Sequence, residues 1–406
     1  MREIREITVR FQGRTVGRLA AHGRFRTAFQ YDGEWLRSGF SISPVSLPLE
    51  DRVFIADADP FDGLFGVFSG SLPGSWGRLL TDLVIRENGG EPQAYGPLER
   101  LAIVGNSGLG ALTYEPDLHP EAKPELTAPD RISDACRQVL QHDDPADITD
   151  PGSLFALGGS SGGSRPKILT EISGEDWIIK FPSLIDPPDL GEEEHAYSLC
   201  ARRCGIEVPE TRLFPSGKCG SFFGVRRFDR EKAPDGTVRR IHCVTVSGLL
   251  ETSHSFPCLD YDTLMRLVRS MTGSHREVME MYRRMCFNVF AHNRDDHSDN
   301  FSFLYDEKAR AWMLAPAYDM TWSSSVCGEH ATIVHGNGSN PGMNDILAVA
   351  AEAGISRRKA LEIAEEIREI TEEDLGVYLR RKRQISERAG HGYCCRELTD
   401  RIRSRS

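Results

Sequence analysis

An acidic loop followed by one further aspartate constrains the fold of this 406-residue chain more than any other feature. The loop covers residues 293–300, and Asp319 lies downstream. Before the loop, apolar residues recur at helical spacing over 276–292, which predicts a buried amphipathic helix. After the loop, the apolar runs 301–305 and 311–314 predict two strands joined by a turn. This order of elements would bring the loop and Asp319 to one place.

The spacing within the loop assigns roles to its residues. Asp295 and Asn300 are five positions apart, as are the catalytic aspartate and the metal-binding asparagine of protein kinases. By that interpretation Asp295 accepts the proton of a substrate hydroxyl, whereas Asn300 and Asp319 hold Mg²⁺ against the phosphates of ATP.

Two other interpretations of the loop stay open at this point. Asp, Asn and His are common in turns because their side chains bond to nearby backbone. The side chains of His292, Asp295, Asp296 and His297 could also bind a hard metal ion in a hydrolase. Other segments have to decide among the three.

A glycine-rich stretch from Gly158 to Ser164 precedes Lys167 and an apolar, strand-like run. Glycines let backbone N–H groups approach phosphates without side chains in the way. Gly/Ser runs are also typical of flexible linkers, but this one lies between strand-like segments. It has neither the GxGxxG pattern of ordinary kinases nor the ending of a P-loop, so it indicates phosphate binding only together with its neighbours.

A lysine, Lys180, lies in the otherwise apolar run 177–182. It is costly to bury there unless an anion meets it, and a strand-end lysine that reaches solvent is the ordinary alternative. In kinases such a lysine contacts the ATP phosphates and a helix glutamate, which here would be Glu194 in the predicted helix 192–204. The chain order of glycine loop, lysine, glutamate, acidic loop and final aspartate predicts a kinase-like fold.

Further motifs resemble the HipA family, the serine/threonine-kinase half of bacterial HipA–HipB toxin–antitoxin pairs. The residues that carry the resemblance lie at 31–36, 43–49, 65–73, 76–80, 105–112, 160–167, 228–230 and 293–297. Each motif is modestly specific, but their joint order is highly specific and covers nearly the whole chain.

The resemblance implies an ATP- and Mg²⁺-dependent kinase that phosphorylates a serine or threonine of a cytosolic protein. In the best-known members this target is an aminoacyl-tRNA synthetase, and its modification slows growth. The family also implies inhibitory autophosphorylation of a glycine-loop serine, by position Ser160 with Ser161 and Ser164 as neighbours. A phosphate there, carrying roughly −1.5 to −2 charge, would repel the phosphates of ATP.

The family partner is a HipB-like DNA-binding antitoxin, so direct contact of this chain with nucleic acid is expected to be absent or minor. The expected nucleotide-binding residues lie on the loop, strands, helix and acidic loop: Gly158, Gly159, Ser160, Ser161, Gly162, Gly163, Ser164, Lys167, Lys180, Glu194 and His297.

One position departs from the family pattern. Family members frequently have Lys immediately before the catalytic-loop asparagine, and here that position is Asp299. An anion beside the transferring phosphate should weaken electrostatic stabilisation of the transition state. The alternative function is therefore a catalytically weak or inactive kinase-fold module that binds a partner or acts as a corepressor. A metal-dependent phosphohydrolase is the third function that we consider.

The expected fold class is α+β, a kinase-like bilobal fold with an extra N-terminal, mostly β subdomain and an all-helical C-lobe. We expect the subdomain over residues 1–115, a Pro- and acid-rich linker over 116–130, the kinase N-lobe over 131–250 and the C-lobe over 251–406. The length of the chain favours two or three such parts.

Charge and cysteine content bear on the cellular setting. A net charge of −11 argues against nucleic-acid binding by the chain itself, and the basic run 380–383 is expected to be a solvated helix end. The ten cysteines include no CxxC pair, and the charged N-terminus resembles no signal peptide. No apolar run approaches the ~20 residues that span a bilayer. We expect a reduced, cytoplasmic protein without membrane partners.

Overall fold

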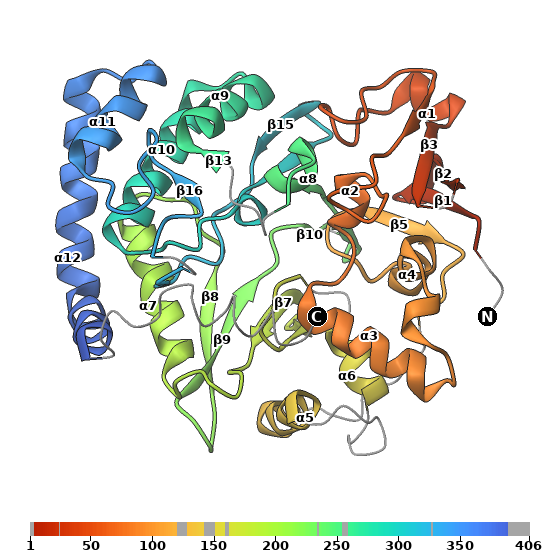
Figure 1. Ribbon diagram of the computed structural model, residues 1–406, viewed down its shortest axis with the longest axis horizontal. Coiled ribbons are helices and arrows are strands. Elements are labelled where there is room, and N and C mark those ends of the chain that lie inside the picture. Colours follow the sequence, from red (N-terminus) through yellow and green to blue (C-terminus); the bar gives the residue numbers. More distant parts are fainter. Residues whose placement is uncertain are drawn as a thin grey trace, which may run out of the picture. The chain divides into compact units, whose positions relative to one another are not determined.

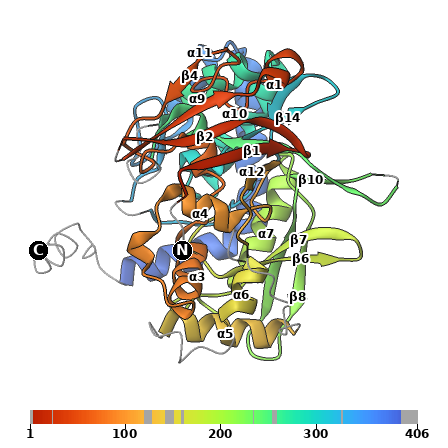
Figure 2. The ribbon, with the colours of Figure 1, turned by 90° about the vertical axis from the view of Figure 1, so that its right-hand side faces the viewer.

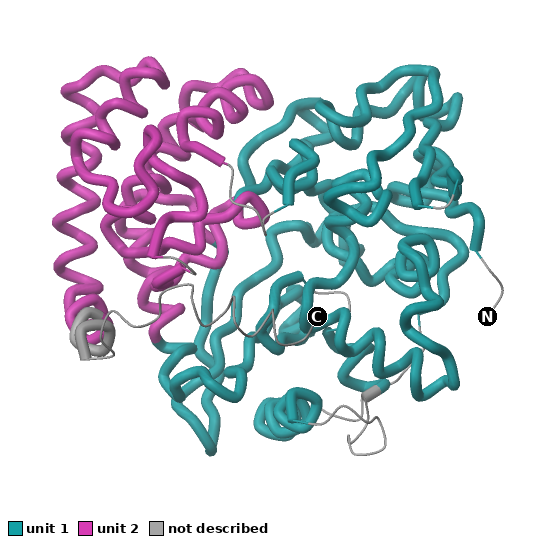
Figure 3. Tube along the Cα trace, viewed as in Figure 1, with its two compact units in different colours: residues 1–192, 209–256, 301–315 teal, residues 193–208, 257–300, 316–406 magenta. Residues whose placement is uncertain are grey.

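The structure of the chain is a computed structural model. It describes residues 4–23, 25–119, 128–141, 151–158, 162–233, 235–253, 259–325 and 328–388. The chain divides into two compact units, shown in Figure 3. Unit 1 comprises residues 1–192, 209–256 and 301–315, and unit 2 comprises residues 193–208, 257–300 and 316–406.

Unit 1 begins with a five-stranded antiparallel sheet in the order β4-β3-β2-β1-β5. Figure 1 labels β1, β2, β3 and β5 of this sheet, and Figure 2 labels β4. Its strands are β1 (Glu6–Phe11), β2 (Arg14–His22), β3 (Arg26–Tyr31), β4 (Val53–Ile55) and β5 (Leu112–Glu115). In β1 the buried residues Ile7, Val9 and Phe11 alternate with more exposed ones, so one face of the strand points into a core. Figure 2 shows β1 and β2 side by side.

Short helices connect these strands and follow them. They are α1 (Gly33–Ser38), α2 (Gly66–Ser69), α3 (Ser75–Glu87), the 3-10 turn η1 (Pro92–Ala94) and α4 (Pro97–Val104). Two more helices precede the second sheet, α5 (Pro129–Gln141) and α6 (Pro151–Gly158). Proline at the first position of α4 suits a helix start, where its missing N–H is not needed.

The second sheet of unit 1 is antiparallel with the order β6-β7-β9-β8. Its strands are β6 (Lys167–Ile172), β7 (Glu175–Lys180), β8 (Thr211–Pro215) and β9 (Ser221–Arg226). One hydrophobic core joins this sheet to α3, α5 and α6 and includes Trp76, Leu80, Phe155, Ile168 and Phe181. Burial of each large apolar side chain contributes about 1.5–3 kcal/mol, so α3 is held firmly beside the elements that flank the glycine loop.

The rest of unit 1 consists of a hairpin, a small sheet and one short helix. The elements are β10 (Arg230–Lys232), β11 (Val238–Arg240), β12 (His242–Thr245), β14 (Ser302–Asp306), β15 (Ala311–Leu314) and α8 (Val246–Leu250). The C-lobe is expected over 251–406, and residues 301–315 of that range lie in unit 1, where β14 pairs with β12.

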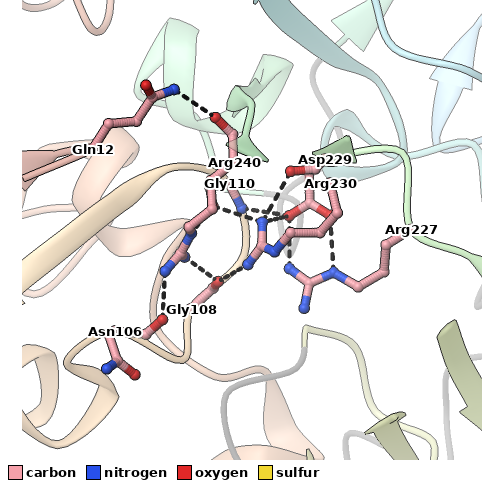
Figure 4. Close-up of polar contacts among 8 residues, drawn as sticks. All are labelled: Gln12, Asn106, Gly108, Gly110, Arg227, Asp229, Arg230 and Arg240. Carbon is pink, nitrogen blue, oxygen red and sulfur yellow. Dashed lines mark hydrogen bonds and ion pairs between the residues drawn. The ribbon is translucent and has the colours of Figure 1, made fainter. Parts of the chain in front are cut away.

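A buried ion cluster fixes the hairpin to the loop between α4 and β5 (Figure 4). Arg227 and Arg230 both form ion pairs with the Asp229 carboxylate, whose Oδ2 also accepts the N–H of Gly110 at 2.7 Å. Arg230 and Arg240 donate to the carbonyls of Gly108 and Gly110. The motif 228–230 therefore joins distant segments of unit 1.

Unit 2 is mainly helical. Helix α7 (Leu190–Arg203) belongs to unit 2 from residue 193 on. The other elements of unit 2 are α9 (Tyr261–Thr272), α10 (His275–Phe290), the 3-10 turn η3 (Ser298–Asn300), α11 (Met343–Glu352), α12 (Arg357–Arg388) and the short strands β13 (Leu259–Asp260) and β16 (Thr332–Ile333). The strands pair in parallel, so the expected all-helical C-lobe also holds this small β element. The predicted helices 192–204 and 276–292 are α7 and α10, with ends that differ by one or two residues.

Sequence signals explain the helix ends around the acidic loop. Asp260 caps α9 by accepting the N–H of Asp262, and Gly273 ends that helix at a φ of 63°. Ser274 then caps α10 by accepting the N–H of Glu277. In the described part of the chain, no helix combines the length and apolarity needed to cross a membrane.

Candidate functional site

Two lysines of the expected nucleotide site lie next to each other in unit 1. Lys167 begins β6 and Lys180 ends β7, and the antiparallel register places them directly opposite each other. Directly opposite side chains share one face of the sheet with Cβ atoms ~4.5–5.5 Å apart, and like charges there repel. Lys167 is buried, and Lys180 is half-buried with its Nζ 5.5 Å from the ring centre of Phe223. The strands therefore hold two ammonium groups that a shared anion would stabilise.

The described glycines of the loop lie tightly around Lys167. The Lys167 Nζ donates to the Gly162 carbonyl. A Cβ at Gly158 would lie 2.1 Å from the Lys167 carbonyl oxygen, and Gly163 has a φ of 82° with its would-be Cβ 2.5 Å from Nζ. Only glycine fits these two positions. Gly159, Ser160 and Ser161 lie outside the described residues, and Ser164 is exposed.

The N-terminal region of the chain contacts this loop directly. The N–H of Trp76 donates to the Gly163 carbonyl at 3.3 Å, and a Cβ at Gly74 would lie 2.3 Å from the Gly163 nitrogen. Gly74 lets the start of α3 approach the loop backbone. The sequence analysis did not predict this contact, because Gly74 lies between the motifs 65–73 and 76–80 and carries no local signal for a partner in the glycine loop.

The expected catalytic residue Asp295 and the expected metal ligands Asn300 and Asp319 all belong to unit 2. The Asn300 Nδ2 donates to the Asp295 carbonyl at 2.8 Å, which leaves the Asn300 Oδ1 facing away from that bond. The Asp295 residue is exposed. The Tyr318 hydroxyl donates to the Asp299 carbonyl at 2.6 Å. Asn300 and Asp319 are each one residue from that hydrogen bond, so the two expected metal ligands lie on adjoining segments.

Asp319 itself has a φ of 53°, a left-handed conformation that Asp tolerates better than most residues. The expected nucleotide contact His297 uses its Nδ1 toward the N–H of Asp299 at 3.2 Å, which stabilises the turn of η3.

Asp296 is not placed as a metal ligand. It is buried, and its carboxylate accepts hydrogen bonds from Tyr261, His330 and the N–H of Thr332. Among the residues that the structure describes, no group of three or more His, Cys, Asp or Glu side chains is arranged to hold a metal. The engagement of Asp296 counts against the hydrolase interpretation, in which it was one of four ligands.

Glu194, the expected partner of Lys180, is buried in α7. Lys180 belongs to unit 1 and Glu194 to unit 2, and their pairing stays a prediction. The neighbouring Glu193 is 1% exposed and pairs with Arg381 at 3.3 Å and Lys382 at 3.0 Å. The expectation that the basic run 380–383 is merely solvated was wrong for these two residues, because the end of α12 provides the counter-charge for a buried acid of α7.

Each unit, taken by itself, offers groups that suit one part of Mg-ATP. A glycine-lined backbone next to two lysines suits a chain of phosphates. The Asn300 amide oxygen and the Asp319 carboxylate are hard oxygen ligands, and Mg²⁺ usually takes one or two of these together with substrate phosphates.

Comparisons with known proteins show which proteins the chain is similar to. The chain is 26% identical over 339 residues to "Putative kinase Y4dM" of Sinorhizobium fredii, covering 79% of this chain and 78% of that protein. It is 29% identical over 349 residues to "Putative kinase Y4mE" of the same organism, covering 78% and 77%. Among solved structures, it resembles HipA from the Shewanella oneidensis complex of HipA, HipB and operator DNA, with a TM-score of 0.67, 18% identity and coverage of 92% of this chain and 90% of that one.

The fold likeness confirms the predicted α+β, kinase-like fold class. A family model for the HipA N-terminal domain matches residues 7–115, and one for the HipA-like C-terminal domain matches residues 159–375, more than half of the chain. This protein therefore belongs to the HipA family.

Proposed function

We propose that this chain is a serine/threonine protein kinase that transfers the γ-phosphate of ATP to a protein hydroxyl. The observation that carries the proposal is the arrangement of the acidic loop in unit 2. The hydrogen bonds from Asn300 to Asp295 and from Tyr318 to Asp299 hold together the two segments that carry the proposed base and the two proposed metal ligands. Two curated relatives carry the names "Putative kinase Y4dM" and "Putative kinase Y4mE", which support the same reaction.

Each proposed role follows from the chemistry of the residue. Asp295 is exposed, so its carboxylate can reach a hydroxyl of a large protein substrate and accept its proton. Asn300 and Asp319 would hold Mg²⁺, and Lys167, Lys180 and the backbone of 158–164 would hold the phosphates. When bound, Mg-ATP supplies the phosphoryl group and part of the charge neutralisation that the transfer needs.

The cellular role follows from the family. We propose that the chain acts in the cytoplasm as a growth-inhibiting toxin, with a cytosolic protein target such as an aminoacyl-tRNA synthetase. The solved relative is a HipA in complex with HipB and operator DNA, which supports a HipB-like DNA-binding antitoxin as partner. Autophosphorylation of Ser160 or Ser161 would regulate the kinase, because a phosphate in the loop would repel ATP.

The alternative is a kinase-fold module that binds a partner without efficient transfer, and Asp299 is the observation that favours it. Its backbone N–H and carbonyl are used by His297 and Tyr318, so an acidic residue is fixed directly before Asn300. The fold and the nucleotide site would be the same in both cases, and only the rate would differ.

Intact-mass measurement tests the proposal. Phosphatase-treated wild-type protein should gain one or more phosphates on incubation with Mg-ATP, mapped by peptide analysis to residues 160–164. The Asp295→Gln variant should gain none while it still binds Mg-ATP in a thermal-shift assay. The exposed-site variant Glu365→Gln should behave as the wild type. A wild type that binds ATP but neither modifies itself nor modifies added proteins would favour the binding module.

A further inference from the structure

The segment between Asp319 and α11 lies along the acidic loop, and backbone hydrogen bonds fix the two together. It is described over residues 320–325 and 328–342. The N–H of Ser323 donates to the His292 carbonyl at 3.0 Å, and the N–H of Ala331 donates to the Arg294 carbonyl at 3.1 Å. Two separate points of the segment are thus bonded to the residues just before Asp295.

A buried acid provides the strongest of these connections. Asp296 is 1% exposed, and its carboxylate accepts the Tyr261 hydroxyl at 2.9 Å, the His330 Nδ1–H at 3.0 Å and the Thr332 N–H at 3.1 Å. The Thr332 hydroxyl donates to the Asp296 carbonyl. A buried carboxylate is stable only when several donors surround it, so these partners and Asp296 hold each other in place.

The arginine on the other side of Asp295 is also used by the segment. Arg294 donates to the Gly328 carbonyl and, at 3.2 Å, to the Ser339 carbonyl. Its buried Nε has no hydrogen-bond partner among the described residues. In many kinases a phosphate added to the corresponding segment pairs with arginine and thereby orders the segment. In this chain the two Nη groups of Arg294 donate to two backbone carbonyls instead of to a phosphate.

The far side of the segment has its own anchor. Lys382 of α12 lies 4.9 Å from the ring centre of Trp322 and pairs with the buried Glu193 of α7. At the other end, β16 pairs with β13 at the start of α9. The segment therefore has ordered contacts on both sides that are made entirely by groups present in the unmodified chain.

We propose that Asp296 and Arg294 are positioning residues that lock residues 328–339 onto the catalytic loop, so that the kinase needs no phosphorylation of this segment to become active. The inference rests on the proposed kinase function. The hydrogen bonds of Asp296 fix the backbone next to Asp295 and thereby the position of the proposed base. Misplacement of a catalytic group by about 1 Å costs roughly 10²-fold in rate.

Hydrogen exchange of the full-length, phosphatase-treated protein tests whether residues 328–339 are held on the acidic loop, and this measurement does not depend on kinase activity. The amides of residues 330–334 should be protected in the phosphate-free wild type and in Glu365→Gln. Asp296→Asn should increase their exchange at least tenfold, whereas amides of β6 and β7 should not change. Arg294→Lys, which loses the guanidinium fork but keeps the charge, provides a milder second variant should Asp296→Asn fold poorly.

Steady-state kinetics test whether these contacts of the segment affect kcat. Asp296→Asn should lower kcat about 10²-fold with a KM for ATP within about twofold of the wild type, because the proposed phosphate contacts lie in unit 1. Phosphatase-treated wild type, checked by peptide mapping to carry no phosphate within 320–342, should be fully active.

Two results would overturn the inference. One is activity that vanishes on phosphatase treatment and returns with a phosphate mapped to 320–342. The other is an Asp296→Asn variant with wild-type protection and kcat. If no form of the protein transfers phosphate, the proposed function fails, while protection of 330–334 still reports separately on the lock.

Discussion

Lys167 and Lys180 lie directly opposite each other on the antiparallel strands β6 and β7. Two ammonium groups in that relationship repel each other by a few tenths of a kcal/mol to about 1 kcal/mol. The repulsion turns into attraction when a phosphate chain lies between them. Binding of Mg-ATP between the two lysines is therefore expected to raise the melting temperature of the folded protein.

We expect Lys180→Met to lose most of the stabilisation of the folded protein by Mg-ATP, because one of the two cations proposed to hold the phosphates is removed. Removal of one cation from the site should also lower phosphotransfer about 10²-fold. Thermal unfolding with and without Mg-ATP measures the first effect, because a ligand that binds only the folded state raises the melting temperature. Lys232→Met, at an exposed strand position, is the matched control. An unchanged ATP-induced shift in Lys180→Met would remove this lysine from the site.

Asp299→Lys should raise kcat about tenfold. A cation directly before Asn300 would stabilise the charge that develops on the transferring phosphate, whereas the present carboxylate opposes it. The change should leave the loop in place, since His297 and Tyr318 bond to the backbone of this residue. Glu365→Lys makes the same change in net charge at an exposed position of α12 and should have no effect. An unaltered kcat in Asp299→Lys would mean that its side chain does not sense the phosphate.

Local spacing carried most of what the sequence could tell. α10, the acidic loop and the strands β14 and β15 are consecutive, so their periodicities and the distance from Asp295 to Asn300 sufficed to predict them. The glycine loop was predicted from composition as a backbone that can approach phosphates, which stays a prediction, and the structure adds that positions 158 and 163 exclude a side chain.

Contacts between distant segments were not predictable in the same way. Nothing in the sequence around Gly74 indicates Gly163 as its neighbour, and the buried partner of Lys382 is Glu193 rather than solvent. Asp296 was grouped with its neighbours as a possible metal ligand, whereas the structure surrounds it with hydrogen-bond donors. Composition and periodicity do not distinguish a buried, bonded acid from an exposed one.

The stability of unit 1 should fall as the pH drops from about 6.5 to about 4 because of His242. Its side chain is buried against the rings of Phe40 and Trp312, and its Nε2 donates to the Ile42 carbonyl at 2.8 Å. Burial lowers the pKa of His242 to about 4. Between that value and its usual pKa the unfolded chain binds the proton and the folded chain does not, so acidification favours unfolding by about 3 kcal/mol in all.

His242→Gln keeps an N–H donor and removes the titration, so its urea midpoint should vary less with pH than that of the wild type over this range. His22→Gln, at an exposed position, should retain the wild-type slope. Equal slopes for His242→Gln and the wild type would show that His242 is not the group responsible.

Asp229→Asn should destabilise unit 1 by about 3–5 kcal/mol, the cost typical of removing one partner from a buried ion cluster. Asp229 is 5% exposed and Arg227 is 7% exposed, so the substitution leaves buried guanidinium groups without their counter-charge (Figure 4). Urea unfolding measures the loss, and Asp235→Asn in the exposed turn of the same hairpin should leave the midpoint unchanged.

The activity of the Asp229→Asn protein that remains folded decides between a structural and a catalytic role for the motif 228–230. Because Arg230 and Arg240 bond to the carbonyls of Gly108 and Gly110, we expect a structural role and a wild-type kcat for each folded molecule. A full loss of phosphotransfer in an Asp229→Asn protein that is still folded would instead place Asp229 in the catalytic machinery.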